Sequence, residues 1–524
     1  MSAALTLLPR WAGATFKASA SLSYSVKYES LAAVDLGSNS FHLQVGRVVD
    51  EQIYPLDSLR EPVRLGAGLG KDKYLNSETQ GRALEALARF GERLRGFAPE
   101  AVRAVGTNTL RVAKNANQFL AQAEAVLGFP IEVIFGREEA RLIYVGVSHS
   151  LPPSLDRRLV VDIGGGSTEF IIGTGFEAEL VESLPMGCVS YSLRYFPDGR
   201  IDRSAMKKAQ LAASNEIQRI VVEYRATGWR QAVASSGTAK SIASVLAING
   251  WCEQGISALG LEKLRNQLLK AGHIANLNIG GIRTDRLAIL PGGVALMSAI
   301  FEALELHFLE VSEAALRQGV LYDLLGRFQH HDMRELTVQQ FGRRYHIDAM
   351  QAERVYGLAL ALYDALSAES NEHDRQLLTW AARLHEIGLS IAHTGSHKHA
   401  AYILSNADMP GFSQHEQERL ARIVLAHRGK LSKLQDLPAR NDDWALIFCL
   451  RIAALIHRSR TEIPLPRIDC SENPEGFVLL LPAEWLEAHP LTAAALEAEI
   501  EDWESIGFEL QVEALGPKGR AVAE

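Results

Sequence analysis

The segment VVDIGGGSTEFIIG, residues 160–173, combines side chains that could bind phosphate and a metal ion. Its three consecutive glycines lie between Asp162 and Glu169. Glycine turns let backbone N–H groups converge on an anion, because no side chain blocks the approach. Carboxylates beside a bound phosphate suit Mg²⁺, which takes one or two carboxylates plus phosphate oxygens. The segment therefore predicts a magnesium site at Asp162 and Glu169 and a phosphate-binding turn formed by Gly164, Gly165, Gly166 and Ser167.

A second copy of this segment strengthens the prediction, since a single glycine turn also occurs in ordinary hairpins that need a positive φ. VDLGSNSFHLQVG, residues 34–46, aligns without a gap with residues 161–173, so that Asp35 corresponds to Asp162. Two copies 127 residues apart indicate two related α/β domains rather than a solenoid of short repeats. If the domains face each other, both loops could grip phosphates in one cleft.

A candidate general base lies in GREEARLI, residues 136–143, at an expected helix start. Glu138 and Glu139 are adjacent, and adjacent helical residues point about 100° apart, so at most one should face the cleft. Periodicity does not choose between them. The alternative role for either carboxylate is stabilisation of the helix N-terminus.

Two further segments could contact phosphate. Arg111 follows GTNTL and could clamp phosphate with two hydrogen bonds, or lie on a solvated helix face. SSGTAKS, residues 235–241, is similar to a phosphate or nucleotide turn.

Alternating strand and helix patterns predict α/β layers around both glycine segments, with buried strands at residues 31–36 and 159–163. From about residue 328 the pattern becomes helical and rich in histidine, and from about residue 463 it indicates a small α+β unit. The helical part contains His385-Glu386 where a metal phosphohydrolase of the HD type would have His-Asp, which is poor support for a second metal site. Its basic side chains could line a path for a polyanion, or simply be solvated; the candidates are His397, Lys398, His399, Arg428 and Lys430.

Composition limits the class of protein. A chain of 524 residues predicts three or four domains. Its formal net charge of −8 argues against a uniformly basic DNA-binding protein, although a local basic channel is compatible with it.

Four scattered cysteines without a C-x-x-C motif fit a reducing cytosol. No stretch reaches the roughly 18 apolar residues of a membrane span, so we expect a cytoplasmic protein, with peripheral membrane association as the alternative. Residues 1–29 are compatible with a transit peptide, a disordered extension or an upstream start codon.

The motifs together resemble the exopolyphosphatase / guanosine pentaphosphate phosphohydrolase family. The resemblance rests on AAVDLGSNSFHLQVGRVVD, VGTNTLR, GREEARLIYVGV, LVVDIGGGSTEFIIG, VESLPMGCVS, ASSGTAKS, ALRQGVLYDLL and ARLHEIGLSIAHTGSHKHAAYIL, and covers roughly residues 30–510. It implies two actin/Hsp70/sugar-kinase-like (ribonuclease H-like) α/β domains, an all-helical HD-like domain and a small α+β domain. The expected units are an unassigned extension (1–29), actin-like domain I (30–142), actin-like domain II (143–328), the helical domain (329–460) and the C-terminal domain (461–524).

The resemblance also implies an activity and residue roles. We expect processive, Mg²⁺-dependent removal of terminal orthophosphate from inorganic polyphosphate, stimulated by K⁺, with hydrolysis of guanosine pentaphosphate as the alternative. The resemblance implies that Glu139 is the catalytic base, that Asp162 and Glu169 bind the metal ion, and that Arg111 contacts phosphate. It gives Ser38 and Asn39 a phosphate-binding role beside the residue 164–167 turn. It further implies a homodimer with a polyphosphate channel lined partly by the helical domains.

Two readings from other classes compete with hydrolysis. An ATP-dependent small-molecule kinase of the same fold superfamily would couple ATP consumption to a phosphorylated acceptor. A non-catalytic sensor of polyphosphate or nucleotide would need no base, and the presence of Glu139 argues against it.

Overall fold

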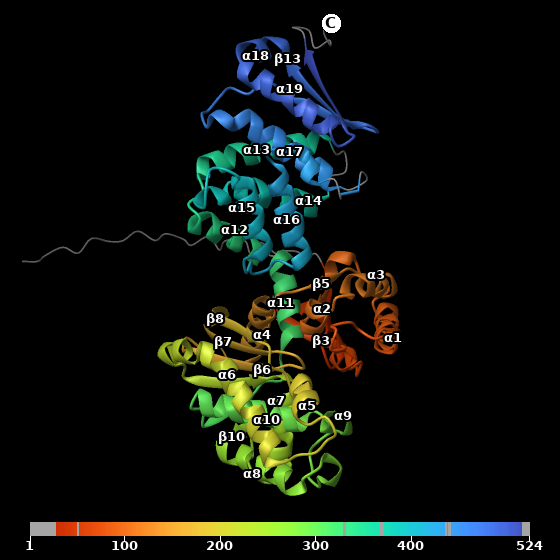
Figure 1. The fold of residues 1–524 in the computed structure, drawn as a ribbon, viewed down its shortest axis with the longest axis vertical. Helices are drawn as coiled ribbons and strands as arrows, with labels where there is room; N and C mark the ends of the chain where they lie inside the picture. The colour runs from red at the N-terminus through yellow and green to blue at the C-terminus, as the bar shows by residue number, and fades with distance from the viewer. Residues whose placement is uncertain are drawn as a thin grey trace, which may run out of the picture.

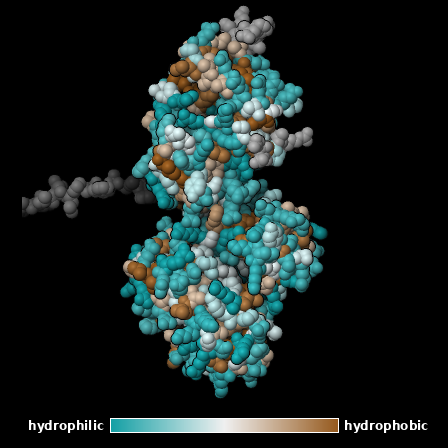
Figure 2. Space-filling model, in the orientation of Figure 1, coloured by the Kyte–Doolittle hydropathy of each residue, from teal (hydrophilic) through white to brown (hydrophobic). Residues whose placement is uncertain are grey.

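The computed structural model describes residues 28–49, 52–152, 154–328, 332–366, 371–434, 437–438 and 442–515. Most of the extension predicted at residues 1–29 lies outside this set. The molecule is elongated, with two α/β lobes at one end and a helical part capped by a small sheet at the other (Figure 1). Figure 2 shows a narrow waist where the two ends meet, with mainly hydrophilic residues on the visible face.

The first lobe is built on a five-stranded sheet with the order β3-β2-β1-β4-β5. Its central strand is apolar and almost wholly buried, as expected of a strand covered on both faces. The strands are β1 (Ser30–Leu36), β2 (Phe41–Val49), β3 (Gln52–Glu61), β4 (Val102–Gly106) and β5 (Ile131–Val133). The helices of this lobe are α1 (Ser77–Arg93), α2 (Asn108–Val112) and α3 (Ala116–Leu127).

The second lobe is built on a six-stranded sheet with the order β10-β11-β9-β6-β7-β8. The strands are β6 (Arg158–Ile163), β7 (Thr168–Thr174), β8 (Glu177–Leu184), β9 (Gln231–Ser235), β10 (Ile256–Ser257) and β11 (Phe308–Val311). Its helices are α5 (Cys188–Tyr195), α6 (Arg203–Thr227), α7 (Ser236–Ile248), α8 (Ala258–Ala271), α9 (Thr284–Leu287) and α10 (Leu290–Ala303).

The two lobes repeat one topology, which accounts for the repeated sequence. In each sheet a two-stranded hairpin is flanked by an antiparallel strand on one side and a parallel strand on the other. The strand order is β3-β2-β1-β4 in the first lobe and β8-β7-β6-β9 in the second. The register places Asp35 opposite His42 in the first hairpin and Asp162 opposite Glu169 in the second. The predicted α/β architecture is confirmed, and the division of these lobes into two domains with the expected bounds stays a prediction.

Two long helices, α4 (Gly136–Ser150) and α11 (Leu316–Phe328), lie between the lobes and pack against each other. They cross so closely that a Cβ on Gly319 would lie 1.7 Å from the carbonyl oxygen of Leu142, which only glycine allows. The core around them draws residues from both sheets. The predicted domain boundary after residue 142 therefore falls inside a continuous helix, because α4 belongs to the packing of both lobes.

The helical part and the C-terminal unit follow as the sequence predicts. The helices are α12 (Met333–Arg344), α13 (Ala349–Leu366), α14 (Glu372–Leu384), α15 (Ser396–Asn406), α16 (Gln414–Ala426) and α17 (Asp443–Ile456). The C-terminal elements are β12 (Asp469–Asn473), β13 (Gly476–Pro482), α18 (Ala483–Ala488), α19 (Pro490–Glu504) and β14 (Glu509–Leu515). The two parts share one core, in which the Phe448 ring stacks on the Phe477 ring with centroids 4.5 Å apart. The HD-like arrangement of the helices stays a prediction.

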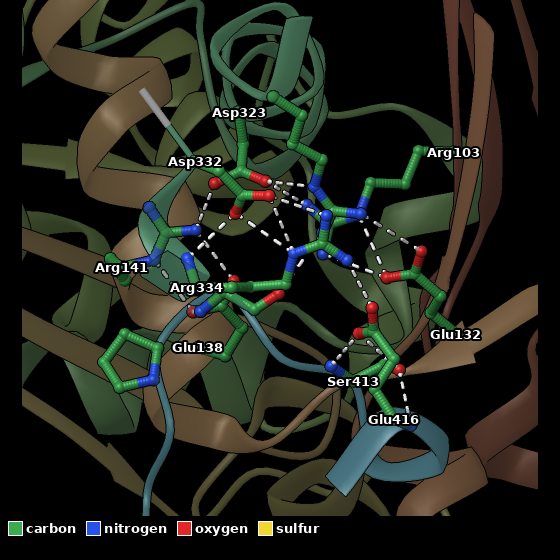
Figure 3. Close-up of polar contacts among 12 residues, drawn as sticks. Arg103, Glu132, Glu138, Arg141, Asp323, Asp332, Arg334, Ser413 and Glu416 are labelled. Atoms are coloured by element: carbon green, nitrogen blue, oxygen red, sulfur yellow. Dashed lines mark hydrogen bonds and ion pairs between the residues drawn. The ribbon is translucent and has the colours of Figure 1, made fainter. Parts of the chain in front are cut away.

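Buried ion pairs lie on both sides of the junction between the lobes and the helical part (Figure 3). Asp323 on α11 binds Arg103 from β4 at 2.6 Å and also binds Arg141 from α4. Burial raises the pKa of Asp323, but these arginines outweigh it and hold the pKa below its ordinary value. Arg334 on α12 binds Glu416 on α16 in the same region. Removing one member of such a buried pair typically costs about 3–5 kcal/mol. Gly411 links the two sides, because its N–H donates to Glu138 at 3.0 Å and its carbonyl oxygen accepts from Arg327 at 3.2 Å.

Two expectations from composition can be compared with the structure. Among the described residues, no helix is both long and apolar enough to cross a membrane. The four thiols of the chain are free, those of Cys188, Cys252, Cys449 and Cys470.

Candidate active site

A cleft of about 360 Å³ lies between the two lobes, where both glycine-containing loops meet. The β1–β2 loop contributes Ser38 and Asn39, and the β6–β7 loop contributes the turn from Gly164 to Ser167. Most sequence-predicted residues of the site thus share one cavity. The cleft is also lined by Asp35, Glu139, Asp162 and the start of α7.

The glycines of the turn are required by the contact between the lobes. Gly164, Gly165 and Gly166 are absent from the positions with positive φ, so a left-handed backbone does not explain them. A Cβ on Gly165 would lie 2.9 Å from Cβ of Ser38, and one on Gly166 would lie 2.3 Å from Oδ1 of Asn108. The absence of side chains in this turn therefore allows the two lobes to pack against each other. It also leaves the backbone N–H groups of the turn accessible to phosphate.

Glu139 is the glutamate that faces the cleft. It lies in the first turn of α4, and its Oε2 accepts a hydrogen bond of 2.8 Å from Nη1 of Arg111. The same Nη1 donates to the carbonyl oxygen of Ile134 at 2.8 Å, which fixes the guanidinium. Arg111 therefore holds the carboxylate in place, and it does not line the cleft as a phosphate clamp would.

Glu138 points the other way, into the network at the waist (Figure 3). Its carboxylate accepts two hydrogen bonds of 2.8 Å from Arg141, one turn further along α4. It also accepts a 3.0 Å hydrogen bond from the backbone N–H of Gly411, which belongs to the helical part. The sequence could not choose between the two glutamates, whereas packing assigns Glu138 to the domain junction.

The carboxylates of Asp35, Glu139 and Asp162 line the cleft, and that of Glu169 lies close enough behind them to interact electrostatically. Burial, followed by the repulsion of neighbouring carboxylates, raises the pKa of Asp35 to about 7, although Arg317 partly opposes this. Burial likewise raises the pKa of Asp162 to about 6. The pKa of Glu169 is raised well above its usual value, mainly by burial and then by Glu139 and Asp162. Such a cluster holds more negative charge than its surroundings solvate, which favours a bound cation.

The donor set fits Mg²⁺. Oδ1 of Asp35 is buried and has no hydrogen-bond partner among the described residues, so it has an unused lone pair beside the cleft. Asp162 lines the same wall, while Glu169 lies behind the turn and accepts a 2.8 Å hydrogen bond from Ser183. Within the described ranges no three acidic, histidine or cysteine residues converge as metal ligands. Mg²⁺ commonly uses one or two carboxylates and completes its shell with water and phosphate. Asp35 was missed as a metal candidate, although its alignment with Asp162 carried the signal.

The other wall of the cleft is cationic, which sequence reasoning did not anticipate. Arg60, Lys240, Arg286 and Arg317 come from different elements and surround His42. Burial and these cations lower the pKa of His42 to about 2, so the imidazole is neutral. Burial also lowers the pKa values of the Arg286 and Arg317 guanidinium groups, each of which lies near Arg60. Cations that repel one another in a partly dry cleft favour an anionic ligand.

The start of α7 supports the prediction made from SSGTAKS. Ser236, Gly237, Thr238 and Lys240 line the cleft. Ser236 has a φ of 88°, a value that residues other than glycine rarely adopt and that is often found at binding sites. Thr238 Oγ1 donates to the carbonyl oxygen of Ile163 at 3.0 Å, which ties this turn to the glycine hairpin.

The predicted polyanion path lies far from the cleft in the single chain. α16 begins close to Gly411, at the junction, and its 13 residues span about 20 Å. The basic cluster lies at its opposite end, where the rings of His397 and His427 are 6.4 Å apart. Burial and then Lys433, Lys398 and Arg428 lower the pKa of His397 to about 4. A channel lined by His397, Lys398, His399, Arg428 and Lys430 stays a prediction.

Comparison with known proteins places this geometry in a family. Residues 44–328 match the Ppx/GppA phosphatase family, and residues 333–500 match Ppx/GppA phosphatase, domain III. The chain belongs to the Ppx/GppA phosphatase family. Members of the Ppx/GppA family are phosphoanhydride hydrolases, so the predicted enzyme class is confirmed.

Individual relatives of this Ppx/GppA protein carry two kinds of name. A protein of Vibrio cholerae named guanosine-5′-triphosphate,3′-diphosphate pyrophosphatase is 37% identical over 94% of this chain and 100% of the relative. One of Aeromonas hydrophila with the same name is 37% identical over 91% of this chain and 97% of the relative. The crystal structure of an exopolyphosphatase from Cytophaga hutchinsonii is 25% identical, covers 57% of this chain and 98% of its own, and has a TM-score of 0.53. The expected α/β fold is thereby supported, and the substrate is left to the proposal below.

Proposed function

We propose that this chain hydrolyses the terminal 5′-phosphoanhydride of guanosine 5′-triphosphate 3′-diphosphate, which is guanosine pentaphosphate. The observation that carries the proposal is its end-to-end similarity to relatives named for that substrate, of which it covers 97–100%. The sequence motifs alone favour inorganic polyphosphate, and these relatives move the preference to the nucleotide. The cationic wall supports this choice, since a nucleotide with phosphates on two positions needs anion-binding groups away from the cleaved bond.

The chemistry follows from the position of Glu139. Its carboxylate, held by Arg111 at 2.8 Å, takes a proton from a water that attacks the terminal phosphorus. The bond from phosphorus to the bridging oxygen breaks, and the shortened nucleotide leaves with the electron pair. Backbone N–H groups of the Gly164–Ser167 turn and the Ser38–Asn39 loop stabilise charge on the phosphoryl oxygens. Asp162 and Asp35, with Glu169 beside them, would hold Mg²⁺, which supplies positive charge to the phosphate oxygens when bound.

Polyphosphate hydrolysis is the second candidate. It is favoured by the similarity to the Cytophaga exopolyphosphatase structure and by the remote basic cluster of the helical part. In this case the expected K⁺ stimulation, homodimer and channel would apply. The same cleft residues would perform either reaction, because both substrates present a terminal phosphoanhydride.

Orthophosphate release from guanosine pentaphosphate and from long-chain polyphosphate, measured in parallel with Mg²⁺ and with or without K⁺, separates the two candidates. We expect the larger kcat/KM for the nucleotide. A much larger value for polyphosphate would overturn the proposal and restore exopolyphosphatase as the function. Release from neither substrate would remove both, and the variant Glu139→Gln controls for a contaminating phosphatase.

A further inference from the structure

A second cavity of about 330 Å³ lies behind the cleft, next to the junction with the helical part. Its walls come from five segments of the chain: α2, the start of α4, the β6–β7 turn, the end of β8 and the loop between α15 and α16. Arg111, Arg137, Pro185 and Asp408 are among its lining residues. None of the reaction steps described above uses this cavity.

The second cavity adjoins the catalytic cleft through a thin partition. Asn108 and Ser167 line both spaces. Asn108 is half-buried and packs against the backbone of Gly166, yet in the described part of the chain its side chain has no hydrogen-bond partner. A change in the rotamer of the Asn108 side chain would connect the cleft with the second cavity, without movement of either lobe.

The chemistry places a product next to this partition. The attacking water lies between Glu139 and the terminal phosphorus, so the newly formed orthophosphate lies against Glu139. Arg111 binds Glu139 at 2.8 Å and lines the second cavity, which makes this ion pair part of the wall between the two spaces. The remaining product extends the other way, toward the cationic wall, because it leaves opposite the attacking water. The remaining product therefore blocks the path by which orthophosphate could leave through the cleft itself.

The charges of the second cavity suit an anion in transit. Arg111, Arg137 and the free N–H groups at the start of α4 attract phosphate. Glu182 and Asp408 both bind Arg137, the latter at 2.9 Å, and they offset much of this attraction. A cavity with balanced charge would pass orthophosphate without trapping it.

We propose that the second cavity is the exit for orthophosphate, gated by Asn108, through which phosphate leaves while the other product still occupies the cleft. The proposal rests on the hydrolysis proposed above and holds for either substrate. For guanosine pentaphosphate it makes orthophosphate the first product to leave. For polyphosphate it would allow the shortened chain to stay bound between rounds.

Blocking the outer end of the cavity tests this exit. Asp408 is exposed and belongs to the helical part, so Asp408→Trp should fill the mouth without touching the cleft. Asp408→Glu is the matched control, since it keeps the negative charge that offsets Arg137 and adds far less bulk than tryptophan. Pro185→Trp fills the mouth from the β8 side, at another exposed position.

Bond cleavage is followed by quenched-flow single turnover with the better substrate, and release by a fluorescent phosphate-binding protein in stopped flow. We expect both tryptophan variants to cleave at the wild-type rate and to release orthophosphate roughly ten-fold more slowly, with Asp408→Glu unchanged. Release at the wild-type rate in both tryptophan variants would overturn the exit, as would equal slowing of cleavage and release. Failure of the unaltered chain to cleave either substrate would instead refute the proposed function.

Discussion

Replacing Glu139 by glutamine isolates the base from its surroundings. The side chain is about one-tenth exposed and bound to Arg111, so its position depends on that partner. Glutamine has the same length and keeps an oxygen that can accept from Nη1 of Arg111. The lobes, the loops and the carboxylates proposed to bind metal are untouched, so we expect folding and substrate binding to persist.

The size of the effect follows from the role. General base catalysis contributes about 10²–10⁴ in rate, which is about 3–5.5 kcal/mol of barrier. An amide cannot take the proton of the attacking water, and no other carboxylate has the same place on α4, because Glu138 is committed to Arg141 and Gly411. We therefore expect kcat to fall by about 10²–10⁴, with little change in KM when KM reflects binding.

The assay is orthophosphate release under saturating substrate, with substrate affinity measured separately by calorimetry. Glu138→Gln is the matched control on the adjacent residue. It weakens a buried ion pair and should lower the thermal midpoint while leaving kcat within a few-fold. A kcat of Glu139→Gln within about ten-fold of the wild type would refute the assignment of the base. A large loss of kcat in Glu138→Gln alone would show that the two glutamates had been exchanged.

Three further predictions concern the other parts of the site. Arg111→Gln should lower kcat and leave KM unchanged, because Arg111 positions the base; a raised KM with normal kcat in steady-state assays would instead support a phosphate clamp. The pKa of Asp35 is raised to about 7 and that of Asp162 to about 6. In the metal-free protein these two carboxyls therefore contribute stability when they are protonated, fully so below their unfolded pKa of about 3.9. That contribution is lost as the pH rises through about 6–7. Calorimetry should accordingly show a Mg²⁺-induced rise in melting temperature that grows from about pH 5 to about pH 8, and an equal rise at both would count against the site. The double variant Lys398→Ala/Arg428→Ala should raise KM for long-chain polyphosphate, most strongly at low salt, and spare guanosine pentaphosphate; equal effects on both substrates would argue against a chain-binding path.

Local patterns determined the parts of this protein that depend on neighbouring residues. The apolar runs before each glycine segment become buried strands, β1 and β6, because their residues face cores on both sides. The ungapped alignment of the two hairpins predicts the duplicated topology, since one supersecondary unit read twice gives the same strand order twice. The chemical inventory of acid, base and glycine turn was likewise present in the sequence.

Only the tertiary structure decided how those groups are used. Which glutamate faces the cleft, and which of them Arg111 contacts, depend on which side of α4 meets the cleft and which meets the helical part. Glycine is needed in the turn of the second hairpin because Ser38 and Asn108, from the first lobe, pack directly against its backbone. The cationic wall is assembled from positions spread between β3 and α11. Contacts of this kind are fixed by the packing of whole domains, and periodicity along the chain carries no information about which distant side chains will meet.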